Sequence, residues 1–450
     1  MSGKPDAGPA VVSEAQREWV ERAWARIDVA RLRDLAVGMT GLASPTGEEA
    51  PLARWLAGTM TGLGLSGTYQ PIDDSQANAL GWLGGDGTGA DLLLYAPIDT
   101  LTVGTEEEDL PWAGPELRRD MRATATVEGD YVIGLGASNP KGHGACVIAA
   151  VDAVRRAGVP LRGNVRIGLG AGGMPTNKRP PPHARRYNAG QGSGCSFMLE
   201  QGCWADFAVI AKPGWAVAWE EVGLCWFEVR VHGTYSYVGS RHRLPYRNPI
   251  VDAATVIQGL EEWFPRYAAA HTGGLVAPQG NIGAVSGGWE RTGSLSPAVC
   301  KLLLDLRTSP RSEPTAVRRE FGEAVAAIVA ANPGLAVDWD MVLSIPGTRT
   351  PADDWVVRAA VAAWEELERR PHEPIPLTSG ATDANILRNR GIPTARIGMD
   401  RAGAEAPLPV DFPMGMNVVD VREMRRLTKH LVYTIITTCS RGRDELGLPR

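Results

Sequence analysis

The chain has 450 residues, of which 44% are hydrophobic and 22% are charged, and its formal net charge is −5. Because one hydrophobic core rarely serves a chain of this length, we expect two domains. The composition is that of a globular protein without a clustered basic face, which argues against a nucleic-acid-binding function.

The sequence shows no sign of export or of membrane insertion. Residues 1–16 lack the apolar stretch of a signal peptide, and no apolar run approaches the length of a membrane span. The six cysteines contain no C-x-x-C pair, which argues against a zinc knuckle or a redox motif. We therefore expect a cytoplasmic protein with free thiols and with neither membrane nor nucleic acid as a partner.

The first half of the chain alternates between helical and apolar-strand patterns. Residues 13–64 have helical apolar spacing, and Ser13 with Gln16 resembles a capping box. Thr46 and Glu49 have the spacing of the N-cap and the third residue of a second helix. Further predicted elements are strands at 92–95, 164–169 and 206–210 and a helix at 145–157. Buried strands that alternate with helices predict an α/β core.

The pattern changes after Glu221. Residues 225–232 alternate polar and apolar side chains, as a strand with one exposed face does. The predicted elements that follow are a helix at 248–264, strands at 281–286 and 298–306, a helix at 314–331 and a strand at 336–342. This β-α-β-β-α-β order is typical of a ferredoxin-like unit.

After Pro346 the chain returns to α/β patterning, with predicted elements at 355–369, 384–390, 394–397 and 421–438. We therefore predict a core domain formed by residues 1–221 and 344–450, with a small α+β domain inserted at 222–343. A Pro- and Gly-rich loop at 177–194 interrupts the core. It is either a lid over a site or a loop that lies on the surface without a function.

Seven stretches of the chain, in a fixed order, point to a known family. They are SPTGEE at 44–49, LLLYAPID at 92–99, GLGASNPKGHGA at 134–145, VRIGLGAGG at 165–173, DFAVIAKP at 206–213, the inserted domain, and SGATDA at 379–384 with GIPTARIG at 391–398. Together they resemble the di-zinc aminoacylase, acetylornithine deacetylase and succinyl-diaminopimelate desuccinylase family. The resemblance implies a mixed-sheet, zinc-peptidase-like α/β core with an inserted ferredoxin-like lid and dimerisation domain. It also implies a homodimer formed through residues 222–343.

The resemblance further implies where the metal ligands of that family would fall. In the family, two zinc ions share a bridging Asp, each takes one His and one further carboxylate, and a Glu acts as general base on the metal-bound water. The corresponding positions of this chain hold Pro97, Asn139, Gly172, Gly173, Lys212 and, for the last His, a residue near Pro413. These residue types cannot hold a divalent ion as His and carboxylate do. We therefore predict a divergent member of the family with a degenerate metal site, no bound metal and no cofactor.

The replacements together make the site less negatively charged. Removing two zinc ions alone would leave crowded carboxylates in a pocket, whereas here the carboxylates are replaced as well and Lys212 brings a cation. With the retained Asp99 nearby, Lys212 would either form a buried ion pair or direct its ammonium at a substrate carboxylate or a developing oxyanion. This pattern favours a pocket adapted to work without metal. Neutral drift followed by charge compensation is the alternative.

Four residues are predicted to be catalytic. Lys212 and Tyr237 polarise the substrate carbonyl, Tyr237 standing at the position of the family's lid-domain His, and Asp99 or His143 acts as the base. A solvent-facing loop position is an equally good interpretation of His143. Cys146 could act as a nucleophile only if His143 turned inward.

Seven further residues are predicted to contact the substrate, namely Asn139, Lys141, Arg241, His242, Asn248, Thr382 and Asp383. Lys141 lies at a helix N-terminus, where anions bind favourably. Arg241 and His242 belong to a basic segment suited to clamping a carboxylate. The expected partner is therefore a small-molecule substrate that carries a carboxylate.

The predicted function is that of a metal-independent, amidohydrolase-like enzyme acting on a small amide, a cyclic amide or an N-acyl amino acid. One alternative is lyase, isomerase or cyclase chemistry in the same pocket. Another is a non-catalytic pseudoenzyme that only binds its ligand.

Overall fold

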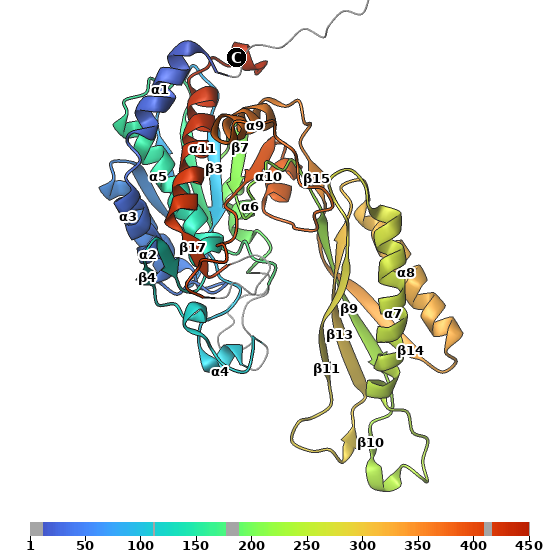
Figure 1. Ribbon diagram of the computed structural model, residues 1–450. Helices are drawn as coiled ribbons and strands as arrows, with labels where there is room; N and C mark the ends of the chain where they lie inside the picture. Colours follow the sequence, from blue (N-terminus) through green and yellow to red (C-terminus); the bar gives the residue numbers. More distant parts are fainter. Residues whose placement is uncertain (1–11, 111–112, 177–188, 409–415, 450) are drawn as a thin grey trace, which may run out of the picture. The chain divides into compact units, whose positions relative to one another are not determined.

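The computed structural model describes residues 12–110, 113–176, 189–408 and 416–449 (Figure 1). The chain folds into two compact units. Unit 1 comprises Met1–Trp219, Thr350–Pro374 and Thr382–Arg450, and unit 2 comprises Glu220–Arg349 and Ile375–Ala381. The assignment of Ile375–Ala381 to unit 2 is a feature that no pattern in the sequence indicated.

Unit 1 is built on a six-stranded mixed sheet. Its strands are, in spatial order, β1 (Ser66–Pro71), β2 (Ala77–Leu83), β6 (Val165–Gly170), β3 (Leu92–Pro97), β7 (Phe207–Ala211) and β16 (Thr394–Ile397). The last four strands are parallel, and β2 is antiparallel to both β1 and β6. The strands predicted at 92–95, 164–169 and 206–210 are confirmed, because continuous apolar runs suit parallel strands that are buried on both faces.

Helices cover both faces of this sheet. They are α1 (Glu14–Trp24), α2 (Val29–Thr40), α3 (Ala50–Gly62), α5 (His143–Arg156), α6 (Ser193–Glu200), α9 (Trp355–Glu368), α10 (Ala384–Asn389) and α11 (Val421–Cys439). In β3, Leu92 and Leu94 pack in the core that contains α5 and α11, which lie side by side in Figure 1. Leu93 and Tyr95 pack in a second core that contains α6 and α10. Each face of the strand is therefore buried.

The two predicted helix starts have different outcomes. Ser13 and Gln16 form the predicted capping box of α1. The prediction for α3 is wrong, because Glu49 rather than Thr46 occupies the N-cap position and makes no capping bond. The Thr46 hydroxyl instead donates to the carboxylate of Asp99.

Smaller elements complete unit 1. They are α4 (Glu106–Asp109), the helical turns η1 (Arg119–Met121), η2 (Ala137–Gly142) and η4 (Asp444–Leu446), and a three-stranded sheet of β4 (Thr126–Glu128), β5 (Tyr131–Ile133) and β17 (Val418–Asp420). The turn η2 leads directly into α5, so its residues are placed by the packing of that helix.

Unit 2 is an antiparallel sheet with two helices on one face (Figure 1). In spatial order its strands are β11 (Gly280–Gly287), β13 (Val299–Thr308), β9 (Gly223–His232) and β14 (Ala336–Ile345), and its helices are α7 (Pro249–His271) and α8 (Pro314–Ala331). Phe227, Val229 and Val231 of β9 pack in the core shared with these helices. The predicted ferredoxin-like order of elements is confirmed.

Short strand pairs flank this sheet. The strand β8 (Glu220–Glu221) pairs with β15 (Thr348–Arg349), and β10 (Ser236–Tyr237), which precedes the turn η3 (Val238–Ser240), pairs with β12 (Leu295–Ser296). All six cysteines are free of disulfide bonds. Within the described ranges, no helix combines the length and the apolar character needed to cross a membrane.

Candidate functional site

Most of the site residues predicted for the core gather where parallel strands of unit 1 end. Asp99 follows β3, Lys212 follows β7, and the Gly172–Gly173 pair follows β6. Asn139 lies in η2, ahead of α5. The carboxyl ends of parallel strands share one edge of a sheet, and α/β proteins bind their ligands at that edge.

Asp99 is fully buried and held by three donors. The Thr46 hydroxyl donates to its Oδ2 at 2.6 Å, and the Gly173 and Met174 amides donate to Oδ1 at 2.7 Å and to Oδ2 at 3.0 Å. Burial raises the pKa of Asp99, while the bond from Thr46 and the positive charge of Lys212 partly oppose that shift. Its oxygens are therefore held by these neighbours rather than by a contact ion pair with Lys212.

Lys212 directs its ammonium at an amide. Its Nζ donates to Oδ1 of Asn139 at 3.3 Å and lies 4.0 Å from the sulfur of Met174, and the residue is only 5% exposed. Asn139 is fully buried, and its Nδ2 has no hydrogen-bond partner in the described part of the chain. The site thus combines a nearly buried cation with an unsatisfied amide donor.

Glu49 is a buried neighbour of Asp99 that sequence reasoning assigned only to helix capping. Its Oε1 accepts the amides of Gly47 and Gly172, each at 2.9 Å, and Nε2 of Gln76 at 3.4 Å. Its Oε2 has no partner among the described residues. Burial and the neighbouring charge of Asp99 raise the pKa of Glu49 well above its ordinary value, which favours the protonated carboxyl.

The glycine pair leaves no room for the acidic side chains that a zinc pair needs. Gly172 has a φ of 63°, and a Cβ there would lie 2.0 Å from the carbonyl oxygen of Ala189. A Cβ on Gly173 would lie 2.3 Å from the Cβ of Pro97. Across the described ranges, no group of three or more His, Cys, Asp or Glu is placed to hold a metal ion. The described residues around Asp99 therefore do not supply the ligands of a di-zinc centre.

His143 does not fit the predicted role of general base. It is fully buried, its Nδ1 lies 2.7 Å from the carbonyl oxygen of Ser138, and its Nε2 accepts the amide of Met399 at 3.1 Å. Burial lowers the pKa of His143 to about 3. The alternative of a solvent-facing loop residue is also wrong, because both nitrogens of the neutral ring bind backbone groups.

Lys141 and Cys146 are likewise buried, and their side chains bond to backbone groups. The Lys141 ammonium donates to the carbonyl oxygen of Leu42 at 2.7 Å, just beyond α2, and burial lowers its pKa to about 7. This contradicts the predicted contact between Lys141 and a substrate anion. Cys146 is buried and its thiol donates to the carbonyl oxygen of Met424, while burial raises its pKa to about 12. Such a thiol does not supply a nucleophilic thiolate.

Asp383 and Thr382 precede α10, next to the glycine pair. The buried Tyr95 donates its hydroxyl to Oδ2 of Asp383 at 2.6 Å, and the same oxygen lies 2.9 Å from the Cβ position of Gly173. The Thr382 hydroxyl accepts the amide of Ala384 at 3.2 Å. Asp383 therefore borders the site, and Tyr95 is a second neighbour that sequence reasoning read only as part of an apolar strand.

The remaining predicted residues belong to unit 2. Tyr237 is 57% exposed, and Arg241 stacks on the ring of Tyr246, its guanidinium carbon 4.5 Å from the ring centre. The exposed His242 accepts a bond from Arg243, and Asn248 caps α7 by accepting the amide of Ile250 at 3.0 Å. A carboxylate clamp by Arg241 and His242 stays a prediction. Most of the predicted lid loop at 177–194 and Pro413 lie outside the described residues.

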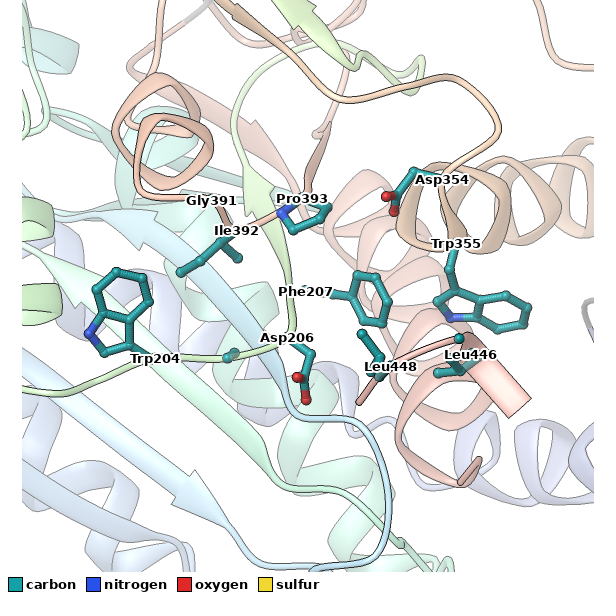
Figure 2. Close-up of a pocket in the computed structure, with 12 residues that line it drawn as sticks. Trp204, Asp206, Phe207, Asp354, Trp355, Gly391, Ile392, Pro393, Leu446 and Leu448 are labelled. Carbon is teal, nitrogen blue, oxygen red and sulfur yellow. The ribbon is translucent and has the colours of Figure 1, made fainter. Parts of the chain in front are cut away.

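A cavity of about 460 Å³ lies elsewhere in unit 1 (Figure 2). It is lined by residues at the amino ends of β7, β16 and α9, among them Phe207, Pro393 and Trp355, and holds none of the predicted site residues. Asp206 on its wall is paired with Arg443 through two bonds of 2.7 and 2.8 Å. Its position marks the edge of the sheet opposite the candidate site.

No protein-family model matches the chain. Three solved structures resemble it over nearly their whole lengths. The di-peptidase Dug1p from Saccharomyces cerevisiae superposes with a TM-score of 0.70 at 11% identity, covering 94% of this chain and 99% of that chain. Human carnosine dipeptidase 1 gives 0.67 at 15% identity, covering 96% and 100%.

The M20 family metallo-carboxypeptidase Sso-CP2 from Sulfolobus solfataricus gives a TM-score of 0.62 at 14% identity, covering 95% of this chain and 100% of that chain. At such identities the likeness concerns the fold. The chain therefore has the fold of M20 family peptidases and related amide hydrolases.

Proposed function

We propose that this chain hydrolyses the C–N bond of small amides, cyclic amides or N-acyl amino acids, and that it does so without zinc. The fold is shared with peptidases, which cleave amide bonds. The observation that carries the proposal is the Lys212 ammonium, 3.3 Å from Oδ1 of Asn139 in a nearly buried position. A fixed cation at this place supplies the charge that stabilises a carbonyl oxygen as it becomes an oxyanion.

In the proposed reaction Asp99 is the general base. It accepts a proton from water while the water oxygen bonds to the carbonyl carbon and the carbonyl electron pair moves onto the oxygen beside Lys212. When the tetrahedral intermediate collapses, the C–N bond breaks and the proton passes from Asp99 to the leaving nitrogen. The products are a carboxylic acid and an amine. The raised pKa of Asp99 favours this role because a stronger base takes up the proton more readily.

Hydrolysis is expected to be insensitive to chelators. After dialysis against EDTA the protein should release amine from N-acyl amino acids within about twofold of its untreated rate, because no step uses a metal-bound water. Incorporation of ¹⁸O from labelled water into the acid identifies hydrolysis and separates it from lyase, isomerase or cyclase chemistry. A loss of about tenfold or more that added zinc restores would contradict the proposal.

We also propose that two copies of the chain pair through unit 2. The strand β11 is an edge of its sheet, so its outer backbone groups are available to another strand. Val285 on this strand is 55% exposed, and Ile250 and Trp289 are 45% and 57% exposed. The Ile250 side chain lies 3.7 Å from the Cβ position of Gly288, so these apolar groups adjoin the end of β11. A second copy docked on the same edge buries them in a symmetric contact.

Val285→Lys is expected to convert a dimer into a monomer. The substitution places a charge in a contact that repeats on both copies, so each lysine meets a desolvated apolar surface. Size-exclusion chromatography with light scattering measures the change. Val342→Lys is the matched control, because Val342 is 47% exposed on the opposite edge strand β14. A monomeric wild-type protein, or equal effects of both substitutions, would rule out pairing through β11.

A further inference from the structure

We propose that Asn139 is a second catalytic residue, whose Nδ2 and the Nζ of Lys212 bind the same substrate oxygen. This inference rests on the proposed function and deepens it. Asn139 is fully buried, its Oδ1 accepts from Lys212, and its Nδ2 has no partner among the residues that the structure describes. A buried donor without a partner is able to bind an acceptor atom of a ligand.

The orientation of the Asn139 amide follows from the chemistry of its neighbour. An ammonium group only donates hydrogen bonds, so the amide atom that faces Lys212 has to be oxygen. The Nδ2 group then keeps its two N–H donors for another acceptor. A flipped amide would place its N–H groups against the ammonium, which offers no acceptor.

The backbone holds Asn139 before any ligand arrives. Its amide and that of Ser138 both donate to the carbonyl oxygen of Met416, at 3.2 and 2.9 Å, and the Lys141 amide donates to the carbonyl oxygen of Gly136 at 3.0 Å. A donor fixed in advance stabilises an oxyanion without reorganising during the reaction. The turn η2 therefore holds Asn139 in place as a hydrogen-bond donor.

A neutral amide at this position adds no negative charge beside Lys212. A carboxylate in its place would form an ion pair with the ammonium at the same distance and would weaken its pull on a substrate oxygen. The Lys212 ammonium and the Asn139 Nδ2 group can only donate hydrogen bonds. Together they favour a substrate oxygen that becomes negatively charged during the reaction. The ligand class is therefore a carbonyl that becomes a tetrahedral oxyanion, and its stable analogues are tetrahedral phosphinate anions.

Binding of two matched anions tests the pair of donors. Dimethylphosphinate and acetate each carry one negative charge and two oxygens, but only the phosphinate is tetrahedral. We expect the wild-type protein, with EDTA present, to bind dimethylphosphinate about tenfold more tightly than acetate in an NMR or calorimetric titration. Asn139→Asp should abolish this preference, and Asn139→Ala should do the same if the carboxylate variant fails to fold.

Kinetics separates a catalytic from a structural role of Asn139. In folded Asn139→Asp we expect kcat to fall about 100-fold while KM changes less than about threefold, because the lost donor acts on the oxyanion. Unchanged kcat and unchanged phosphinate binding would overturn the inference while leaving the proposed hydrolysis intact. If the wild-type protein shows no turnover, a phosphinate preference that depends on Asn139 still supports the two-donor site, and its absence refutes it.

Discussion

Lys212→Met is expected to lower kcat/KM by about 100- to 1,000-fold, the loss typical of removing one fixed oxyanion donor. Methionine keeps the length of the side chain and removes its charge. In the structure the ammonium lies beside Asn139 and influences the pKa of Asp99, so its removal takes away a charge in a water-poor region. Because the charge acts mainly on the developing oxyanion, the loss should fall on kcat rather than on KM.

The comparison uses steady-state hydrolysis of the same N-acyl amino acids, with thermal unfolding as a check on folding. Lys429→Met is the matched control, since the half-buried Lys429 lies over the ring of Trp24, far along the chain from the site strands. It should retain kcat/KM within about twofold, as expected for a residue outside a catalytic site. A Lys212→Met protein that keeps the wild-type rate would exclude Lys212 as the group that stabilises the oxyanion. It would favour the alternative that the site has lost its catalytic role.

Local patterns predicted the fold well because they record burial. The run Leu92-Leu93-Leu94-Tyr95 was predicted as a buried strand, and its side chains alternate between two cores. The alternation in 225–232 likewise matches the packing of Phe227 and Val229 against α7 and α8. A continuous apolar run carries the information in the first case, and the alternation of polar and apolar residues carries it in the second. The strands β1 and β2, in which polar residues and glycine interrupt the apolar ones, were not predicted.

Site geometry was harder to predict, because it depends on contacts between distant segments. Thr46 has the spacing of a helix N-cap, yet its hydroxyl donates to Asp99, 53 residues away. His143 stands among glycines and was predicted to be either a general base or a solvent-facing loop residue, but the Met399 amide, 256 residues away, binds its ring. No local pattern contains these partners. The lone Nδ2 of Asn139 is a property of the folded environment, which sequence spacing does not report.

The proposal that Lys212 and Asn139 are site residues was accessible from sequence, but only through motif order. Both follow strands or turns whose positions the resemblance fixed, and the structure brings their side chains to 3.3 Å. Glu49 was not identified as a neighbour of the site, because its spacing from Thr46 was already explained by helix capping. A buried acidic residue with a strongly raised pKa is recognised only when its desolvation is known.

Lys141→Met is expected to make stability less dependent on pH. Burial lowers the pKa of Lys141 from an ordinary 10.5 to about 7, so the folded state holds this proton less tightly than the unfolded state does. The resulting penalty is fully present below about pH 7 and disappears as pH rises through about 10.5, which means that wild-type stability gains from rising pH in this window. The size of this effect is about 2–4 kcal/mol, allowing for relaxation around the buried amine.

The measurement is urea denaturation of both proteins at about pH 6 and about pH 10, reported as the difference between variant and wild type. Methionine leaves the carbonyl oxygen of Leu42 without its donor, which costs about 1–3 kcal/mol at both pH values and cancels in the comparison. The variant should therefore gain about 2–4 kcal/mol relative to wild type on going from pH 10 to pH 6. Lys429→Met, a less buried lysine, should show a smaller change of the same sign. An equal stability difference at both pH values would mean that Lys141 keeps its ordinary pKa inside the fold.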